Sequence, residues 1–249
     1  MFNEAARIER TIDLLRASPV WRPDVEFLFV DDGSTDATAA TTIAALGAAP
    51  GAATRVVRAD RNRGKGAAVR LGMMESVGCV IAFVDADLSL NPAEIERAYD
   101  LLLSAQADAV VGERIVASNK KSRIRRIESL VFRRIVEAMA PTGVRDPQCA
   151  LKLFRREVGL ALFAAMQTDG FAFDVELLAL LRRGHLRVRE LPVIWEHQPG
   201  SRVDPVRDAV RMVREVVGIR RSLVGRPQPV ISSLPIVQRR LADRTSGGG

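Results

Sequence analysis

The stretch CVIAFVDADLSLNPAEI, residues 79–95, decides the fold. An apolar, β-rich run ends there in two aspartates separated by one alanine, and a helical pattern follows. Carboxylates at the end of a buried strand are costly to desolvate unless a cation is brought to them. Asp85 and Asp87 therefore either cap the next helix or hold a metal ion. In an extended chain side chains alternate, so both would face the same side.

Strand and helix patterns alternate on both sides of this stretch. We predict strands at residues 26–32, 54–59, 79–87 and 107–113, and helices at residues 4–17, 35–46, 65–77 and 92–104. This order predicts an α/β fold with a single doubly wound, mostly parallel sheet flanked by helices. The chain begins at what reads as the exit of a strand, so we expect its first strand to be missing.

The pattern changes after residue 113. We predict a basic amphipathic helix at residues 122–139, a helix near 173–182, a strand within 186–197 and an amphipathic helix at 205–222. The apolar stripe of the last helix fits packing on the domain or lying on a membrane surface equally well. We expect one domain over residues 1–224 and a disordered basic tail over residues 225–249, which is rich in Pro, Ser and Gly.

Composition excludes several classes of site. Two cysteines and two histidines among 249 residues are too few for a disulfide framework, a zinc site or a histidine metal cluster. A metal would be held mainly by carboxylates, which favours Mg or Mn. The sequence shows neither an apolar run long enough to span a bilayer nor a secretory leader, so we expect a cytoplasmic protein, soluble or peripheral.

The net charge of +7 is concentrated in one segment. Residues 114–134 hold eight Lys or Arg and one acid, Glu128. A local basic patch indicates an anionic partner such as phosphate, nucleic acid or lipid headgroups. Only one aromatic residue, Phe132, lies among these cations, so stacking platforms for bases are lacking and we expect no nucleic-acid partner.

Two further segments carry candidate binding chemistry. FVDDGSTDAT, residues 29–38, places Asp31 and Asp32 at a strand end, and a helix cap explains its Ser34 or Asp36 but not two adjacent acids. DRNRGKGAAVRLG, residues 60–72, sets a glycine-flanked lysine at the start of a helix, which suits phosphate. Strand ends in such sheets meet at one edge. Together these segments indicate a nucleotide diphosphate bound through a divalent ion.

In this order and spacing FNEAARI, VDDGSTD, NRGKGAAVRLG and VDADLS resemble the family 2 glycosyltransferases of the GT-A fold. RDPQCALKLFRRE, GFAFDVELL and LPVIWEHQPGSRV are similar to the branch that makes polyprenyl or dolichyl phosphate sugars, with dolichyl-phosphate glucose and mannose synthases as examples. The resemblance covers residues 2–221 and implies a GT-A catalytic domain.

The resemblance also implies roles for individual residues. Those expected to bind the nucleotide sugar are Glu4, Asp31, Asp32, Arg63, Lys65 and Asp85. The metal is expected on the DxD pair, Asp85 and Asp87. Positions matching the acceptor-phosphate site are Arg114, Arg125 and Ser129, and the catalytic residues are expected to be Asp87, Asp146 and Gln148.

The implied reaction is inverting transfer of a hexose, with glucose favoured, from a nucleotide sugar to polyprenyl or dolichyl phosphate, with Mg or Mn as cofactor. UDP-glucose is the favoured donor and GDP-mannose the next. Transfer to a soluble or polysaccharide acceptor is the alternative, and Asp146 is then the candidate base. We expect a peripheral protein on the cytoplasmic face of the membrane, attached through an anionic surface or a separate membrane partner protein.

Overall fold

The computed structural model describes residues 1–47, 51–116, 134, 136–195 and 205–225, with the side chains of 205–210 and 225 excepted. Its helices are α1 (Ile8–Arg16), α2 (Thr38–Leu46), α3 (Lys65–Glu75), α4 (Ala93–Ser104), α6 (Arg156–Ala165), α7 (Phe173–Arg183) and α8 (Pro205–Gly225). Its strands are β1 (Glu26–Asp31), β2 (Ala53–Arg58), β3 (Val80–Phe83), β4 (Ala109–Val116), β5 (Lys152–Arg155) and β6 (Val188–Trp195). The predicted helix at 122–139 and the predicted tail lie largely outside these residues.

The strands form two hydrogen-bonded sheets rather than the expected single one. β1 pairs with β2 in parallel, and the second sheet has the order β3-β5-β4-β6. In that sheet β4 and β6 are parallel, but β5 runs antiparallel to both of its neighbours. The α/β class is confirmed, whereas a single, mostly parallel sheet is wrong because β5, which the sequence pattern did not predict, enters between β3 and β4 in the opposite direction.

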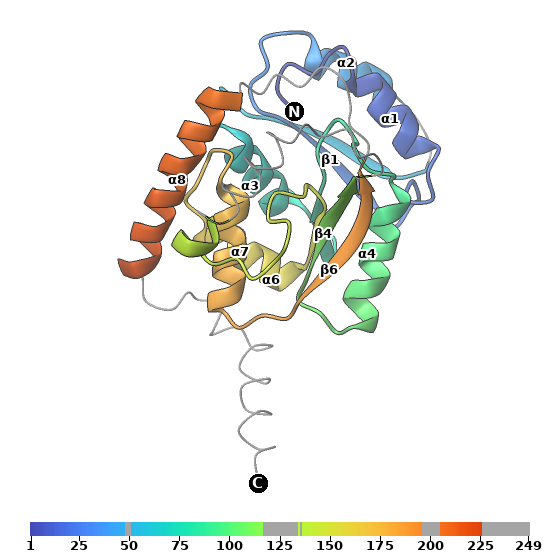
Figure 1. Cartoon of the computed structure of the whole chain (residues 1–249). Helices are drawn as coiled ribbons and strands as arrows, with labels where there is room; N and C mark the ends of the chain where they lie inside the picture. Colours follow the sequence, from blue (N-terminus) through green and yellow to red (C-terminus); the bar gives the residue numbers. More distant parts are fainter. Residues whose placement is uncertain (48–50, 117–133, 135, 196–204, 226–249) are drawn as a thin grey trace.

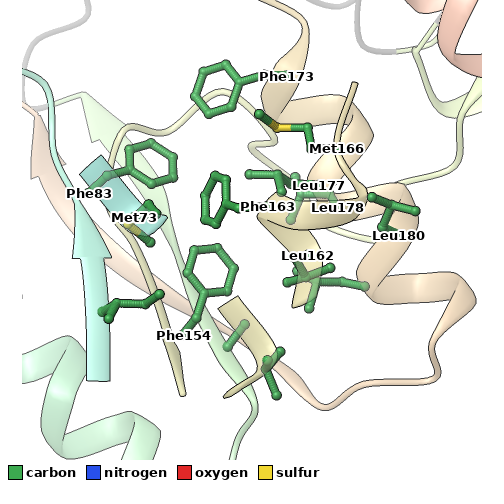
Figure 2. Packing of buried hydrophobic residues seen from close by; sticks show 14 of the residues in the cluster. Met73, Phe83, Phe154, Leu162, Phe163, Met166, Phe173, Leu177, Leu178 and Leu180 are labelled. Carbon is green, nitrogen blue, oxygen red and sulfur yellow. The ribbon is translucent and has the colours of Figure 1, made fainter. Parts of the chain in front are cut away.

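Helices cover both faces of the larger sheet. α4 lies on one side of β4 and β6, and α6 and α7 lie on the other (Figure 1). The α4 side packs Ala98 and Leu102 against Val110, Leu153 and Leu191. The opposite side is the aromatic core that Figure 2 shows, in which Phe83, Phe154, Phe163 and Phe173 pack with Met73 and leucines of α6 and α7. Alternate residues of β5 thus enter different cores, as a strand requires.

The amphipathic pattern of α8 serves packing at its buried positions. Val216 and Ile219 are buried together with Ala172, Val175 and Ala179 of the segment around α7. Arg214, Arg220 and Arg221 point away from this contact and are exposed. None of the helices in the described ranges is long and apolar enough to cross a membrane.

The acidic strand ends lie close to the N-terminal segment. Met1 is joined to the end of β1, since its amino group donates to Val30 O at 2.6 Å and its carbonyl accepts from Asp32 N at 2.8 Å. Asn3 N donates to Ser34 Oγ at 2.9 Å, and Glu4 N donates to Thr38 Oγ1 at 2.7 Å. These contacts fix residues 1–4 against the turn that follows β1.

Candidate functional site

The two adjacent aspartates after β1 have different partners. Asp31 is fully buried, and its Oδ1 accepts from the backbone N of Ser34 at 3.0 Å and from its hydroxyl at 2.5 Å. Its Oδ2 faces Arg58 Nε at 3.3 Å and accepts no hydrogen bond from the described residues. Asp32 accepts from the backbone N of Arg63 at 2.9 Å and of Gly64 at 2.8 Å. Asp32 therefore fixes the turn of residues 63–66 that leads into α3, which we call the glycine-lysine turn.

Glycine is required at two positions of this turn. Gly64 has φ +113°, and a Cβ there would lie 2.5 Å from Asp169 O. A Cβ on Gly66 would lie 2.5 Å from Thr168 O and 2.7 Å from Phe173 Cβ. The glycines thus allow the start of α3 to pack directly on the loop of residues 167–171, rather than only to admit a ligand.

The loop of residues 167–171 and the next residue, Ala172, are held by carboxylates from two helices. Glu176 of α7 accepts from the backbone N of Gln167 and of Thr168, at 2.7 Å for the latter. Glu215 of α8 accepts from Ala172 N at 2.9 Å. Asp169 in turn forms ion pairs with Arg70 and with Arg63, the latter at 3.2 Å. The prediction that Arg63 reaches nucleotide phosphates remains a prediction, and in this structure its guanidinium binds Asp169.

The DxD pair lies in a turn rather than in a strand. β3 ends at Phe83, and Leu88 N donates to Asp85 O at 3.1 Å to close the turn. The expectation of an extended chain through both aspartates is therefore wrong. Leu88 adopts φ +43°, an unusual value for a branched residue, and its buried side chain holds the turn in place. Asp87 Oδ1 accepts from Ser89 N at 3.2 Å.

Lys65 connects the glycine-lysine turn to the DxD turn. Its Nζ lies 2.6 Å from Asp85 Oδ1 and 5.9 Å from the centre of the Phe173 ring. Burial disfavours the charged ammonium, but the carboxylates of Asp85, Asp174 and Asp87 outweigh that effect and raise the pKa of Lys65. Lys65 is therefore a cation at neutral pH and the direct partner of a predicted metal ligand.

A buried ion pair lies behind this lysine. Lys152, on the central strand β5, is fully buried, and its Nζ donates to Asp174 Oδ1 and to Cys149 O, each at 2.6 Å. The sequence reasoning singled out neither residue. The available signal was a lone lysine in the apolar run CALKLF and a lone aspartate at the start of an apolar helix, because such charges are buried only when paired.

Arg114, near the end of β4, and Asp146 form a second charged centre. Arg114 Nε and Nη2 donate to Asp146 Oδ2 and Oδ1 at 2.6 and 2.8 Å, and the guanidinium lies 5.4 Å from the centre of the Trp195 ring. Burial would raise the pKa of Asp146, but the two hydrogen bonds and the charge of Arg114 lower it on balance. The same pair raises the pKa of Arg114 despite its burial.

The structure describes two of the four remaining predicted site residues. Gln148 Nε2 contacts Met212 Sδ of α8 at 3.0 Å. Glu4 lies beside the turn after β1 and pairs with Arg7. Arg125 and Ser129 lie outside the described residues. Within the described ranges no three His, Cys, Asp or Glu side chains are grouped so that they could hold a metal by themselves.

The pattern of glycosyl transferase family 2 matches residues 1–162, the larger part of the chain. The chain belongs to glycosyl transferase family 2. Within the family it is 32% identical to a dolichyl-phosphate beta-glucosyltransferase of Dictyostelium discoideum, over 80% of this chain, and 32% identical to that of Drosophila melanogaster, over 86%. It spans 64% and 71% of the lengths of these relatives.

A solved structure has a similar fold. Glucosyl-3-phosphoglycerate synthase from Mycobacterium tuberculosis, in complex with Mn²⁺, uridine-diphosphate-glucose and phosphoglyceric acid, matches with a TM-score of 0.69. The match covers 91% of this chain and 78% of that chain at 24% sequence identity. The GT-A fold that the motifs predicted for this family 2 chain is confirmed.

Proposed function

We propose that this chain is a catalytic domain that transfers a hexose, with glucose favoured, from a nucleotide sugar to polyprenyl or dolichyl phosphate. The names of the relatives support the acceptor and the glucosyl group. The observation that carries the proposal is the Arg114–Asp146 pair, because it provides a cation for an anionic acceptor and commits the nearest candidate base to an ion pair.

A phosphate acceptor needs no general base. It is already an anionic nucleophile at neutral pH, unlike a sugar hydroxyl. Both oxygens of Asp146 accept hydrogen bonds from Arg114, and the pKa of Asp146 is lowered, so the carboxylate is a poor proton acceptor. Transfer to a soluble or polysaccharide acceptor, for which Asp146 would be the base, is therefore less well supported. Asp146 instead orients Arg114 toward the acceptor.

The donor site is proposed at the glycine-lysine turn and the DxD turn. Two carboxylates fit Mg²⁺ or Mn²⁺, because these ions are commonly bound by one or two carboxylates together with substrate phosphates and water. Asp85 and Asp87 would hold the ion, which would neutralise charge on the leaving diphosphate. Lys65 and Arg63 would bind the phosphates, and Glu4 and Asp31 would lie near the nucleoside. In-line attack by the acceptor would invert the anomeric centre.

Two backbone contacts support a narrower role for Asp32 in this site. Both of its oxygens accept backbone hydrogen bonds from Arg63 and Gly64. We propose that Asp32 shapes the turn that presents Lys65.

Transfer of radiolabel into lipid tests the proposal. The chain is incubated with labelled UDP-glucose, and separately with labelled GDP-mannose, in the presence of polyprenyl phosphate and Mg²⁺ or Mn²⁺. We expect metal-dependent label in the organic phase from UDP-glucose. Asp87→Asn should reduce it by at least about 100-fold, because it removes a charge held for the transition state. Asp100→Asn, at an exposed position of α4, is the matched control and should leave the rate unchanged.

Each other outcome contradicts a defined part of the proposal. If only GDP-mannose labels the lipid, the donor is GDP-mannose and not UDP-glucose. If the donor is consumed into a water-soluble product, the acceptor is a soluble molecule and not a lipid phosphate. If Asp87→Asn is fully active, the DxD turn takes no part in the reaction.

A further inference from the structure

We propose that Lys65 couples nucleotide binding to metal binding, because its ammonium occupies Asp85 until a diphosphate draws it away. This inference rests on the proposed function, since it assumes that the DxD turn holds the metal. Its consequence is that metal and nucleotide bind cooperatively. Metal alone should bind weakly, nucleotide should tighten the metal, and the metal should tighten the nucleotide by the same factor.

The geometry puts the two cations in competition. Lys65 Nζ is 2.6 Å from Asp85 Oδ1, so a divalent ion on that carboxylate would lie next to the ammonium. Metal–oxygen distances for Mg²⁺ and Ca²⁺ span about 2.0 to 2.6 Å, which places the ion within the same shell around the oxygen. Like charges at this separation repel, and the partly buried setting screens them poorly. Lys65 must leave Asp85 for the metal to bind tightly.

The backbone around Lys65 leaves only its side chain free to move. Asp32 fixes the backbone N of Arg63 and Gly64, and Ala67 N donates to Asp169 O at 3.1 Å. Gly64 and Gly66 are packed against the 167–171 loop without room for a Cβ. The switch is therefore a rotation of one lysine side chain on a fixed turn.

The other two carboxylates that act on Lys65 are Asp174 and Asp87. Asp174 Oδ1 is already bound by Lys152, which is anchored to Cys149 O as well, and Asp87 is itself a proposed metal ligand. An anion from outside must supply the new partner. Lys65 is the first residue of α3, and a diphosphate at this helix start would lie at its positive end.

The test measures the affinity for Mn²⁺ from the paramagnetic resonance signal of the free ion, without and with UDP. For the wild type we expect weak binding of Mn²⁺ alone. Lys65→Gln should bind Mn²⁺ alone about tenfold more tightly, a change of about 1.4 kcal/mol, and should therefore gain about tenfold less affinity for Mn²⁺ from UDP than the wild type does. Lys65→Arg retains the charge and should stay close to the wild type. Arg61→Gln, which removes an exposed cation four residues earlier, should leave the Mn²⁺ affinity unchanged both without and with UDP.

The outcomes separate this inference from the proposed function. If the wild type binds no Mn²⁺ even with UDP or GDP, the proposed function fails. If it binds Mn²⁺ with UDP but Lys65→Gln binds Mn²⁺ alone no more tightly than the wild type, only the inference fails. Should Lys65→Gln not fold, a crystal structure of the wild type with UDP and EDTA shows which group Lys65 contacts when nucleotide is bound without metal. Lys65 Nζ on the diphosphate supports the inference, and Lys65 Nζ still on Asp85 overturns it.

Discussion

At the scale of single residues, the charged groups of the site are fixed by other charged groups. Asp146 holds Arg114 by two side-chain hydrogen bonds, and Arg114 N adds a backbone contact to the same carboxylate at 3.2 Å. Lys152 and Asp174 form a similar pair inside the protein. Because Arg114 and Lys152 each have such a partner, their side chains have little conformational entropy left to lose when a substrate binds.

The lowered pKa of Asp146 predicts how stability depends on pH. A carboxyl whose pKa is lower in the folded than in the unfolded chain stabilises the fold above its ordinary pKa of 3.8, and this contribution is lost as the pH falls through the lower, folded value. Asp146→Asn should therefore destabilise the protein by about 2 kcal/mol at pH 7. The difference from the wild type should persist down to about pH 4 and shrink only below it.

Urea unfolding at a series of pH values checks this prediction. Asp100→Asn, on the exposed face of α4, is the control and should differ little from the wild type at any pH. If the difference in unfolding free energy between the wild type and Asp146→Asn already disappears between pH 7 and pH 5, the Arg114 contact does not lower the pKa of Asp146.

At the scale of elements, the start of α3 and the 167–171 loop form one packed unit. α7 and α8 hold the loop through Glu176 and Glu215. Gly64 and Gly66, at the start of α3, pack directly against the loop. α8 therefore supports the proposed donor site through two steps of contact, although it begins about 140 residues after the glycine-lysine turn.

Two Gly→Ala substitutions in helices should have opposite effects. Gly66→Ala should lower the free energy of unfolding by about 1–3 kcal/mol, because its Cβ would meet Thr168 O and Phe173 Cβ below 3 Å. A Cβ at Gly218 in α8 would meet nothing within 4 Å, so Gly218→Ala should raise the free energy of unfolding by up to about 1 kcal/mol. Urea titrations at pH 7 measure both. A Gly66→Ala protein as stable as the wild type would show that the loop moves aside easily.

At the scale of the whole molecule, the excess positive charge favours an anionic surface. The chain carries a net charge of +7, and Arg214, Arg220 and Arg221 lie exposed on α8, away from its packed face. Each basic residue near an anionic bilayer contributes about 1 kcal/mol, screened by salt within about 10 Å at 0.1 M. We propose that the protein attaches peripherally through such residues.

Sedimentation with vesicles tests this attachment. We expect vesicles containing anionic lipid to pellet the protein at low salt and to release it at about 0.5 M NaCl, where charges are screened. Arg220→Glu with Arg221→Glu should weaken pelleting more than Arg10→Glu with Arg189→Glu, which alters exposed arginines of α1 and β6. Pelleting that is absent at every salt concentration would refute attachment through the surface.

The sequence alone determined the α/β class, most helices and strands, the glycine-lysine turn and the acidic strand ends. These are local properties, since apolar periodicity, capping residues and glycine act over a few positions. It also carried the GT-A resemblance, because the motifs keep their order along the chain. It did not predict β5 and α6, whose run LKLFRREVGLALFAA combines a strand buried on both faces with an apolar helix and so lacks a clear period.

Only the tertiary structure decided which charges meet. Lys65 pairs with Asp85 20 residues away, Arg114 with Asp146 32 residues away, and Arg63 with Asp169 106 residues away. The direction of β5 and the division into two sheets belong to the same class of facts. Such contacts depend on how distant elements cross and pack, and no local pattern encodes that. The residues of the site could therefore be named from the sequence, but their partners could not.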